Sequence, residues 1–475
     1  MMTTQNPRKS LLQETIEQGS FWEVDDATLL CLVRDAFPGE LERLKNAEAA
    51  ERQSPPKDDG VNGLTGFPTP SEILYQENFD EVNRTLVGVL ALRWIHNDQY
   101  DTFTRCQPES VRLQRDSFEW LQELFRRGIR DDSDLFPLVL SMVINDLGKD
   151  PNLEEDVYGR KGASVQGMNH DLILLEAVQM GMVPCLDQLD ETQRWDVMLG
   201  LELGSELNAG QLAQAENVPI NLEGLIRMRG HEHAFDLKFM EQILDVAGSA
   251  GHGDATCAKR LIEPVFQSFK VVHEVALEII EEKSTLRDGY DKVLTKRSVM
   301  LHDEQQWQRR LSVHNDSERA LLRLLTMGRT ADKDQAELFY SAFHDLEPED
   351  KEHLVEGLNI DGNEGEMVVI PYYMPAMLSE VLENTKDEPT SNKKDALQSL
   401  MRYLGRVLHE ESHHAPVIEE DIGATSRPGI VIERNVLRAR ETINSLDFKA
   451  DPTVLDKLDV PKGQILQRRR TSQSM

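Results

Sequence analysis

The stretch Leu135–Lys149 reads LFPLVLSMVINDLGK and combines an apolar run with a short polar turn. The run is apolar at nearly every position, which is typical of a helix buried on all sides. The acidic and hydroxyl residues of Asp132–Asp134 precede it and can cap its first turn. Gly148 follows the apolar run at a position where glycine often ends a helix. The sequence therefore predicts a buried helix that ends beside Asn145 and Asp146.

Helical spacing of apolar residues continues on both sides of this stretch and predicts an all-α fold. The helices expected from it run over residues 25–50, 78–96, 109–127, 138–147, 170–182, 190–212, 235–246, 257–282, 317–327, 332–344, 374–383 and 394–409. Two short β-like runs, 367–370 and 429–432, interrupt the later helices. They could pair as a small hairpin or lie as edge segments.

Composition along the chain divides it into five regions. Pro and Gly gather between residues 51 and 69, which marks a linker or loop. The polar end of the chain predicts a disordered tail. The expected regions are a helical N-terminal segment (1–50), this linker (51–69), a helical core (70–300), a helical C-terminal extension (301–446) and the tail (447–475).

The net charge is strongly negative, because 52 Lys and Arg residues face 84 Asp and Glu residues, which gives −32. Such a surface repels phosphate backbones and anionic lipid, so we expect no nucleic-acid or membrane partner. A small anionic ligand would need a local basic pocket or a metal ion. The remaining partners are a small-molecule substrate or another protein.

Four widely spaced cysteines, with no CxxC pair, suit a reducing compartment better than a disulfide framework or a structural zinc site. No apolar signal segment is visible near the start of the chain. Apolar stretches such as Leu86–Leu92 fall well short of the roughly 18 residues that a membrane span needs. We therefore expect a soluble cytoplasmic protein.

The string Asn145-Asp146-Leu147-Gly148-Lys149 resembles the metal-site motif of the HD-domain metal-dependent phosphohydrolases, in which His-Asp is followed by apolar-Gly-Lys. The resemblance covers about a third of the chain, near residues 78–253, and implies an HD-like helical core. The metal ligands that it implies are His96, Asp146, His170, His231 or His233, and Asp245. Asn145 stands where the family has its motif histidine, and the spacing from His96 to Asp146 is longer than usual.

If the resemblance extends to activity, it implies a hydrolase that acts on a small, possibly phosphorylated, molecule. A divalent ion such as iron, manganese or zinc would activate water, since histidines mixed with carboxylates suit such ions. Asp146 would hold the ion and Lys149 would neutralise a phosphate oxygen. The alternative is a catalytically inactive helical scaffold that binds a partner. In that case Asp146 forms a cap or an ion pair, and Lys149 is a solvated cation at a helix end.

A second motif, His409-Glu410-Glu411-Ser412-His413, satisfies the HExxH pattern of zinc peptidases. On a helix the two histidines would lie one turn apart, with Glu410 beside them as general base. A polar helix end with favourably placed histidines is the alternative. Near the end of the chain, three arginines precede Thr471 and Ser472, a pattern similar to that of a basophilic kinase site.

Overall fold

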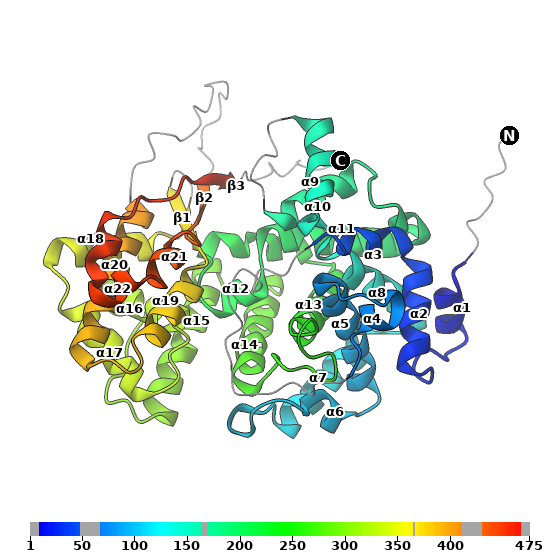
Figure 1. The fold of residues 1–475 in the computed structure, drawn as a ribbon, viewed down its shortest axis with the longest axis horizontal. Helices are drawn as coiled ribbons and strands as arrows, with labels where there is room; N and C mark the ends of the chain where they lie inside the picture. Colours follow the sequence, from blue (N-terminus) through cyan, green and yellow to red (C-terminus); the bar gives the residue numbers. More distant parts are fainter. Residues whose placement is uncertain (1–8, 48–66, 163–168, 364–365, 410–429, 467–475) are drawn as a thin grey trace. The chain divides into compact units, whose positions relative to one another are not determined.

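The computed structural model describes residues 9–47, 67–162, 169–363, 366–409 and 430–466. The fold is all-α, as the sequence predicts, with one small sheet (Figure 1). Among the helices of the described residues, none combines the length and apolar character that crossing a bilayer requires.

The contacts divide the chain into two compact units, of which unit 1 comprises residues 1–206 and 227–270. The helices that lie in it are α1 (Leu11–Glu17), α2 (Asp26–Ala36), α3 (Pro38–Leu44), α4 (Pro70–Tyr75), α5 (Asp80–His96), α6 (Tyr100–Thr104), α7 (Arg115–Gly128), α8 (Leu135–Ile144), α9 (Pro151–Lys161), α10 (His170–Gln179), α11 (Glu191–Glu206) and α13 (Glu232–Gly248). The unit boundary falls within α14 (Glu263–Ile280).

Unit 2 comprises residues 207–226 and 271–475. Its helices are α12 (Ala209–Ala213), α15 (Leu286–Val299), α16 (Asp316–Met327), α17 (Lys333–His344), α18 (Pro348–Asn359), α19 (Met374–Asn384), α20 (Thr390–His409), α21 (Ala439–Ile443) and α22 (Leu446–Ala450). Its strands are β1 (Met367–Tyr372), β2 (Ile430–Asn435) and β3 (Gln464–Leu466). This division differs from the expected boundary near residue 300, because residues 207–226 pack with the later part of the chain.

Glycines allow α5 and α13 to cross in close contact at the centre of unit 1. A Cβ on Gly88 would lie 2.9 Å from the carbonyl oxygen of Leu244, and one on Gly248 would approach the carbonyl oxygen of Arg84 even more closely. Nearly all of α5 is buried, and α13 also packs on α7, α8 and α11. Backbone therefore meets backbone along this crossing, and the turns next to it are held in fixed register.

Helix α8 is the apolar helix that the sequence predicts, but Gly148 does not end it. The helix ends at Ile144, and Gly148 lies in a 3-10 turn, η4 (Leu147–Lys149), with a negative φ. The prediction that Gly148 ends the helix is therefore wrong. Glycine is needed here because the backbone of His170 lies against it, closer than 3.0 Å to where a Cβ would be. The motif glycine thus packs the start of α10 against the turn after α8.

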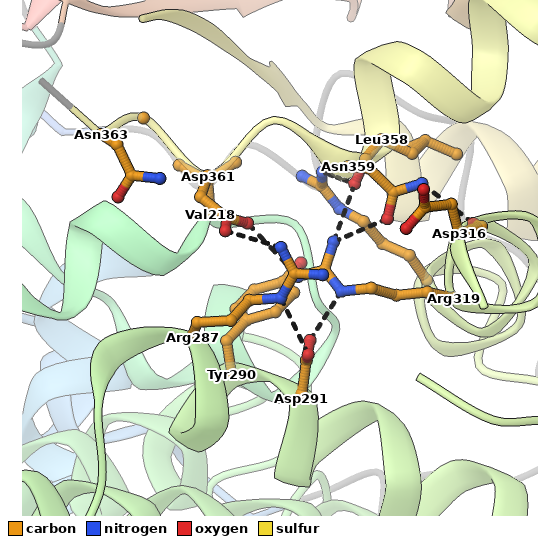
Figure 2. Close-up of polar contacts among 12 residues, drawn as sticks. Val218, Arg287, Tyr290, Asp291, Asp316, Arg319, Leu358, Asn359, Asp361 and Asn363 are labelled. Atoms are coloured by element: carbon orange, nitrogen blue, oxygen red, sulfur yellow. Dashed lines mark hydrogen bonds and ion pairs between the residues drawn. The ribbon is translucent and has the colours of Figure 1, made fainter. Parts of the chain in front are cut away.

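Buried arginines organise the centre of unit 2. Arg319 donates to Asp291 at 2.7 Å, and Arg287 donates to both Asp291, at 2.8 Å, and Asp361, at 2.6 Å (Figure 2). The neighbouring guanidinium, that of Arg323, is 1 % exposed and donates to backbone carbonyls. Its four acceptors are the oxygens of Ala215 (3.1 Å), Leu358 (3.0 Å), Glu216 (3.3 Å) and Asn217 (3.1 Å). These bonds attach residues 215–217 to α16 and so explain why this segment belongs to unit 2.

The sheet departs from the hairpin that the sequence left open. β1 and β2 pair in parallel, with Met367 opposite Ile430, and β3 pairs antiparallel to β2. A parallel pair needs a long crossover, which α19 and α20 provide. The expectation of disorder from residue 447 is also wrong up to residue 466, because α22, a 3-10 turn (Pro452–Lys457) and β3 lie there.

Helix boundaries follow local chemistry that the apolar spacing did not reveal. The helix expected over 25–50 is two helices, α2 and α3, because Phe37 has a non-helical conformation and Pro38 begins a new helix. Helices α9, α15 and α18, which are rich in charged residues, were not predicted.

Substituting Gly248→Ala should lower the free energy of unfolding of unit 1 by at least about 2 kcal/mol, because the new methyl group would push α5 away from α13. Urea unfolding followed by circular dichroism measures this change. The matched control is Gly159→Ala in α9, where nothing lies within 4 Å of the added Cβ. That variant should be unchanged or more stable by up to about 1 kcal/mol, since alanine favours helix. Equal effects of the two substitutions would contradict the close crossing.

Substituting Arg323→Lys should destabilise unit 2 by about 3 kcal/mol or more, because an ammonium cannot reach four separate carbonyls and leaves several unsatisfied. Thermal and urea unfolding provide the readout. Arg287→Lys is the control, since its side chain is 36 % exposed and solvent can replace a lost bond. A tolerated Arg323→Lys would show that the carbonyls find other partners.

Candidate functional site

Charged and polar side chains from four segments of unit 1 meet beside the crossing of α5 and α13, and we call this group the charged centre. Its members are Glu81 and Arg84 from α5; Asn145, Asp146 and Lys149 from the end of α8 and the following turn; His170 and Asp171 from α10; and Lys238, Glu241 and Asp245 from α13.

An ammonium group shared by two buried carboxylates lies at the middle of the charged centre. The Nζ of Lys149 is 2.9 Å from Asp146 Oδ1 and 3.2 Å from Glu81 Oε2. The side chain of Glu81 is fully buried, and that of Asp146 is 6 % exposed. Arg84 donates to the other oxygen of Glu81 at 2.9 Å. Each carboxylate is therefore compensated by a cation from the protein itself.

Burial and the neighbouring charges shift the pKa values of the two carboxyl groups in opposite directions. Burial opposes ionisation of Asp146, but the charges of Lys149, Arg84 and His170 outweigh burial and lower its pKa. Burial, together with the charge of Asp146, raises the pKa of Glu81 to about 7. Asp146 is therefore the ionised member, and Glu81 holds its proton at mildly acidic pH.

A second ion pair on α13 faces the end of α8. Lys238 Nζ lies 2.5 Å from Glu241 and 3.4 Å from the side-chain oxygen of Asn145. Burial raises the pKa of Glu241 to about 7 despite this partner, so the pair is fully ionised above that pH. Burial and then the charge of Asp146 raise the pKa of Asp245. Asn145, which replaces the motif histidine, is thus an acceptor for a buried lysine.

His170 is the partly exposed member, with 31 % of its side chain accessible. Its Nε2 lies 3.9 Å from Asp146 Oδ1 and 3.7 Å from Asp171 Oδ2, which is too far for hydrogen bonds. It begins α10, whose N-cap is Asn169. Of the residues that the sequence analysis named, the structure brings His170, Asp146 and Lys149 near one another, with Asp245 within electrostatic range of Asp146.

His96 is not part of the charged centre. It ends α5, fifteen residues after Glu81, which corresponds to about 22 Å along a helix that rises 1.5 Å per residue. There it stacks on Trp22, with ring centroids 3.7 Å apart and planes 4° from parallel. Since metal–ligand bonds are about 2.0–2.3 Å long, His96 and Asp146 cannot share an ion.

His231 and His233 also lie away from the charged centre, at the start of α13. His233 precedes Asp245 by twelve residues, or about 18 Å along the helix. Its Nε2 lies 3.0 Å from Asp134 Oδ1, and the ring of His231 lies 6.2 Å from that of Trp195. The predicted ligands therefore separate into distant groups.

The charged centre does not fit the divalent ion that the resemblance implies. Of the predicted ligands, Asp146, His170 and Asp245 come together, but the ammonium of Lys149 occupies the coordination side of Asp146. Within the described ranges, the group of three metal-ligand side chains whose donor atoms all lie within 4.8 Å of one another is Cys106, Asp254 and Cys257. The sequence analysis missed this group, for which the Asp-x-x-Cys spacing of Asp254 and Cys257 was the available signal.

The HExxH pattern is only partly within the described residues. His409 is the last residue of α20, and its Nε2 lies 2.5 Å from the carbonyl oxygen of His353. Glu410 and His413 lie outside the described residues, as do the arginines near the end of the chain and Thr471.

The fold and the charged centre define an all-helical protein with a buried ion network in its first unit. The chain belongs to a protein family of unknown function (DUF6829), whose model matches residues 30–455. No curated protein and no solved structure matches the chain.

The raised pKa of Glu81 predicts a pH-dependent stability. Between its ordinary value of 4.5 and about 7, the folded chain holds a proton that the unfolded chain releases, so this residue lowers the free energy of unfolding as pH rises. Glu81→Gln removes that dependence. As the pH rises from 4.5 to 7.5, the free energy of unfolding of the variant should therefore increase by about 1–3 kcal/mol relative to that of the wild type.

Urea unfolding across this pH range measures the difference between variant and wild type. The control is Glu119→Gln on α7, where the side chain is 58 % exposed and its partner is Arg115. A difference between Glu81→Gln and wild type that stays constant with pH would show that Glu81 is ionised throughout.

Proposed function

We propose that the charged centre fixes the arrangement of the helices in unit 1 and that the chain works as a non-catalytic, partner-binding helical protein. The observation that carries this proposal is the position of Lys149, whose Nζ lies 2.9 Å from Asp146 and 3.2 Å from Glu81. In a metal-dependent site the ion would compensate these acids. Here a side chain of the same turn supplies the positive charge.

The charges of the centre support the same conclusion. The cations of the protein nearly balance the buried acids of the charged centre. The acids are Glu81, Asp146, Glu241 and Asp245, and the cations are Arg84, Lys149 and Lys238. An HD-like domain that had exchanged its ion for these cations would keep the order of helices and the Asp-Leu-Gly-Lys turn without the chemistry. Asn145 suits such a domain, since its oxygen accepts from Lys238 at 3.4 Å.

A partner would meet an acidic surface, because the chain carries a net charge of −32. Electrostatic complementarity favours a partner with basic residues at its contact face. Trp195 of α11 is 56 % exposed and belongs to the residue types enriched in protein interfaces. The four free cysteines support a location in the cytoplasm.

A metal-dependent hydrolase that acts on a small phosphorylated molecule is the second candidate. It is favoured by the distance of 3.9 Å between His170 and Asp146 and by the position of Asp245 within electrostatic range of Asp146. In addition, Glu81 near neutral pKa beside the ionised Asp146 is the pairing that acid–base catalysis uses. For this candidate, a divalent ion such as iron, manganese or zinc must displace Lys149 from Asp146.

Substitutions at Asp146 and Lys149 separate the two candidates. Under the proposal, Asp146→Asn and Lys149→Met each lower the free energy of unfolding by about 2–4 kcal/mol, because each leaves a buried charge without its partner. The double variant should lose less than the sum of the two, since neither unpaired charge remains. Urea unfolding measures the three values, with the exposed Lys283→Met as control.

The hydrolase candidate instead predicts changes in metal binding and in catalytic activity. The wild type would then bind about one iron, manganese or zinc ion at the charged centre and hydrolyse p-nitrophenyl phosphate. Asp146→Asn would lose both properties, and Lys149→Met would bind the ion more tightly because a competing cation is gone. Elemental mass spectrometry and a colorimetric assay on the full chain measure them, and either result would overturn the proposal.

A further inference from the structure

Hydrogen bonds hold two segments that are far apart in the sequence together next to Cys106 and Cys257 in unit 1. Cys106 follows α6, whereas Asp254 and Cys257 lie in the connection between α13 and α14. The amide of Ala258 donates to the carbonyl of Phe103 at 3.0 Å. The side chain of Gln107 donates to the carbonyls of Ala258, at 2.7 Å, and Leu261, at 3.1 Å. These bonds fix the two segments at the point where the thiols meet.

One donor atom from each of Cys106, Asp254 and Cys257 lies within 4.8 Å of the other two. The Sγ of Cys257 is 3.9 Å from Asp254 Oδ2. With zinc–sulfur bonds of about 2.3 Å and zinc–oxygen bonds of about 2.0–2.2 Å, ligand atoms of a tetrahedral site are separated by roughly 3.5–3.8 Å. The group is therefore within about 1 Å of the spacing that coordination requires.

Asp254 is held in the orientation that a metal ligand needs. Its Oδ1 accepts from the amide of Thr256 at 3.0 Å and from the hydroxyl of Thr256 at 2.7 Å. These bonds occupy one oxygen and leave Oδ2 facing Cys257. Outer hydrogen bonds of this kind fix ligating carboxylates in metal sites.

The chemistry of the group favours a borderline or soft divalent ion, since two thiols and one carboxyl group are the donors. Asp254 is 5 % exposed and Cys257 is fully buried, whereas Cys106 is partly exposed. The other two donor atoms that lie within 4.8 Å of the Cys257 sulfur belong to Asp254 and Cys106, and neither residue carries a positive charge. A divalent ion would supply the missing positive charge and displace the thiol protons.

We propose that Cys106, Asp254 and Cys257 bind one zinc ion, with water as the fourth ligand on the side of Cys106. The ion fastens the segment after α6 to the connection between α13 and α14. Thr256 is a positioning residue, because it holds Asp254 without offering a ligand in the group. This site is independent of the charged centre, which has its own cations.

The test uses the full chain purified under reducing conditions and incubated with zinc alone, followed by elemental mass spectrometry and competition with a chromophoric chelator. The wild type should hold about one zinc ion. Cys106→Ser and Asp254→Asn should each weaken binding by more than tenfold, and Cys257→Ser should abolish it. Cys31→Ser is the matched control and should retain the ion, and Asp146→Asn reports whether the bound zinc depends on the charged centre.

Cobalt substitution gives a readout that a merely structural role would not change. Thiolate-to-cobalt charge-transfer absorption should be present in the wild type and in Thr256→Ala, and should be lost in Cys257→Ser. Thr256→Ala should bind about 10–100-fold more weakly. Affinity should increase with pH, because binding releases thiol protons.

Three outcomes would overturn the proposal. The first is the absence of bound zinc in the wild type. The second is an equal affinity for zinc in Cys106→Ser and the wild type. The third is a disulfide between Cys106 and Cys257 in the protein purified under reducing conditions. Since Cys106 is partly exposed, its variant tests the site even if Cys257→Ser does not fold. Zinc lost from Asp146→Asn alone would instead support the hydrolase reading of the charged centre, so the two proposals fail in different ways.

Discussion

The crossing of α5 and α13 depends on glycines that let two helix backbones touch. Gly248 lies against the carbonyl of Arg84, and Gly251 lies against that of Asn83, so the first turns of α5 meet the last turns of α13. Any side chain larger than hydrogen at these positions would separate the helices. Because the turns cannot move apart, the charged residues on them are forced to face one another. The electrostatics of unit 1 are a consequence of this packing.

Burying charges in such a crossing is costly unless each has a partner. The structure meets this requirement with residues one turn apart, since Lys149 follows Asp146 by three positions and Glu241 follows Lys238 by three. A mispaired register of the helices would leave one of these charges alone in the interior. The ion network therefore selects one arrangement of the helices more than it adds to net stability.

How far the sequence predicted this site depends on the type of residue. Helix α8 and the residues Asp146, Lys149 and His170 were found because an apolar run and a short motif identify them locally. Glu81, Arg84 and Glu241 were missed, since their charges suggest a solvated face and only the long-range crossing buries them.

The sequence also could not predict which end of a helix lies at the charged centre. His96 was placed near Asp146 because α5 was correctly predicted, but α5 brings its first turn to Asp146 and carries His96 away at its last. The parallel pairing of β1 and β2 likewise depends on the packing of α19 and α20 between them in the chain. Both features are set by tertiary contacts, and hydrophobic spacing contains no information about them.

The charged centre and the group of Cys106, Asp254 and Cys257 differ in the cations that lie beside their acidic side chains. Around Asp146, the charges of Lys149, Arg84 and His170 favour ionisation and outweigh burial. Around Cys257, the two neighbouring donor side chains are those of Asp254 and Cys106, and neither supplies a positive charge. At the second group, an added divalent ion would supply positive charge without displacing a cation of the protein, whereas at Asp146 it would have to displace Lys149. This difference is why we propose metal binding at Cys106, Asp254 and Cys257 and not at the HD-like motif.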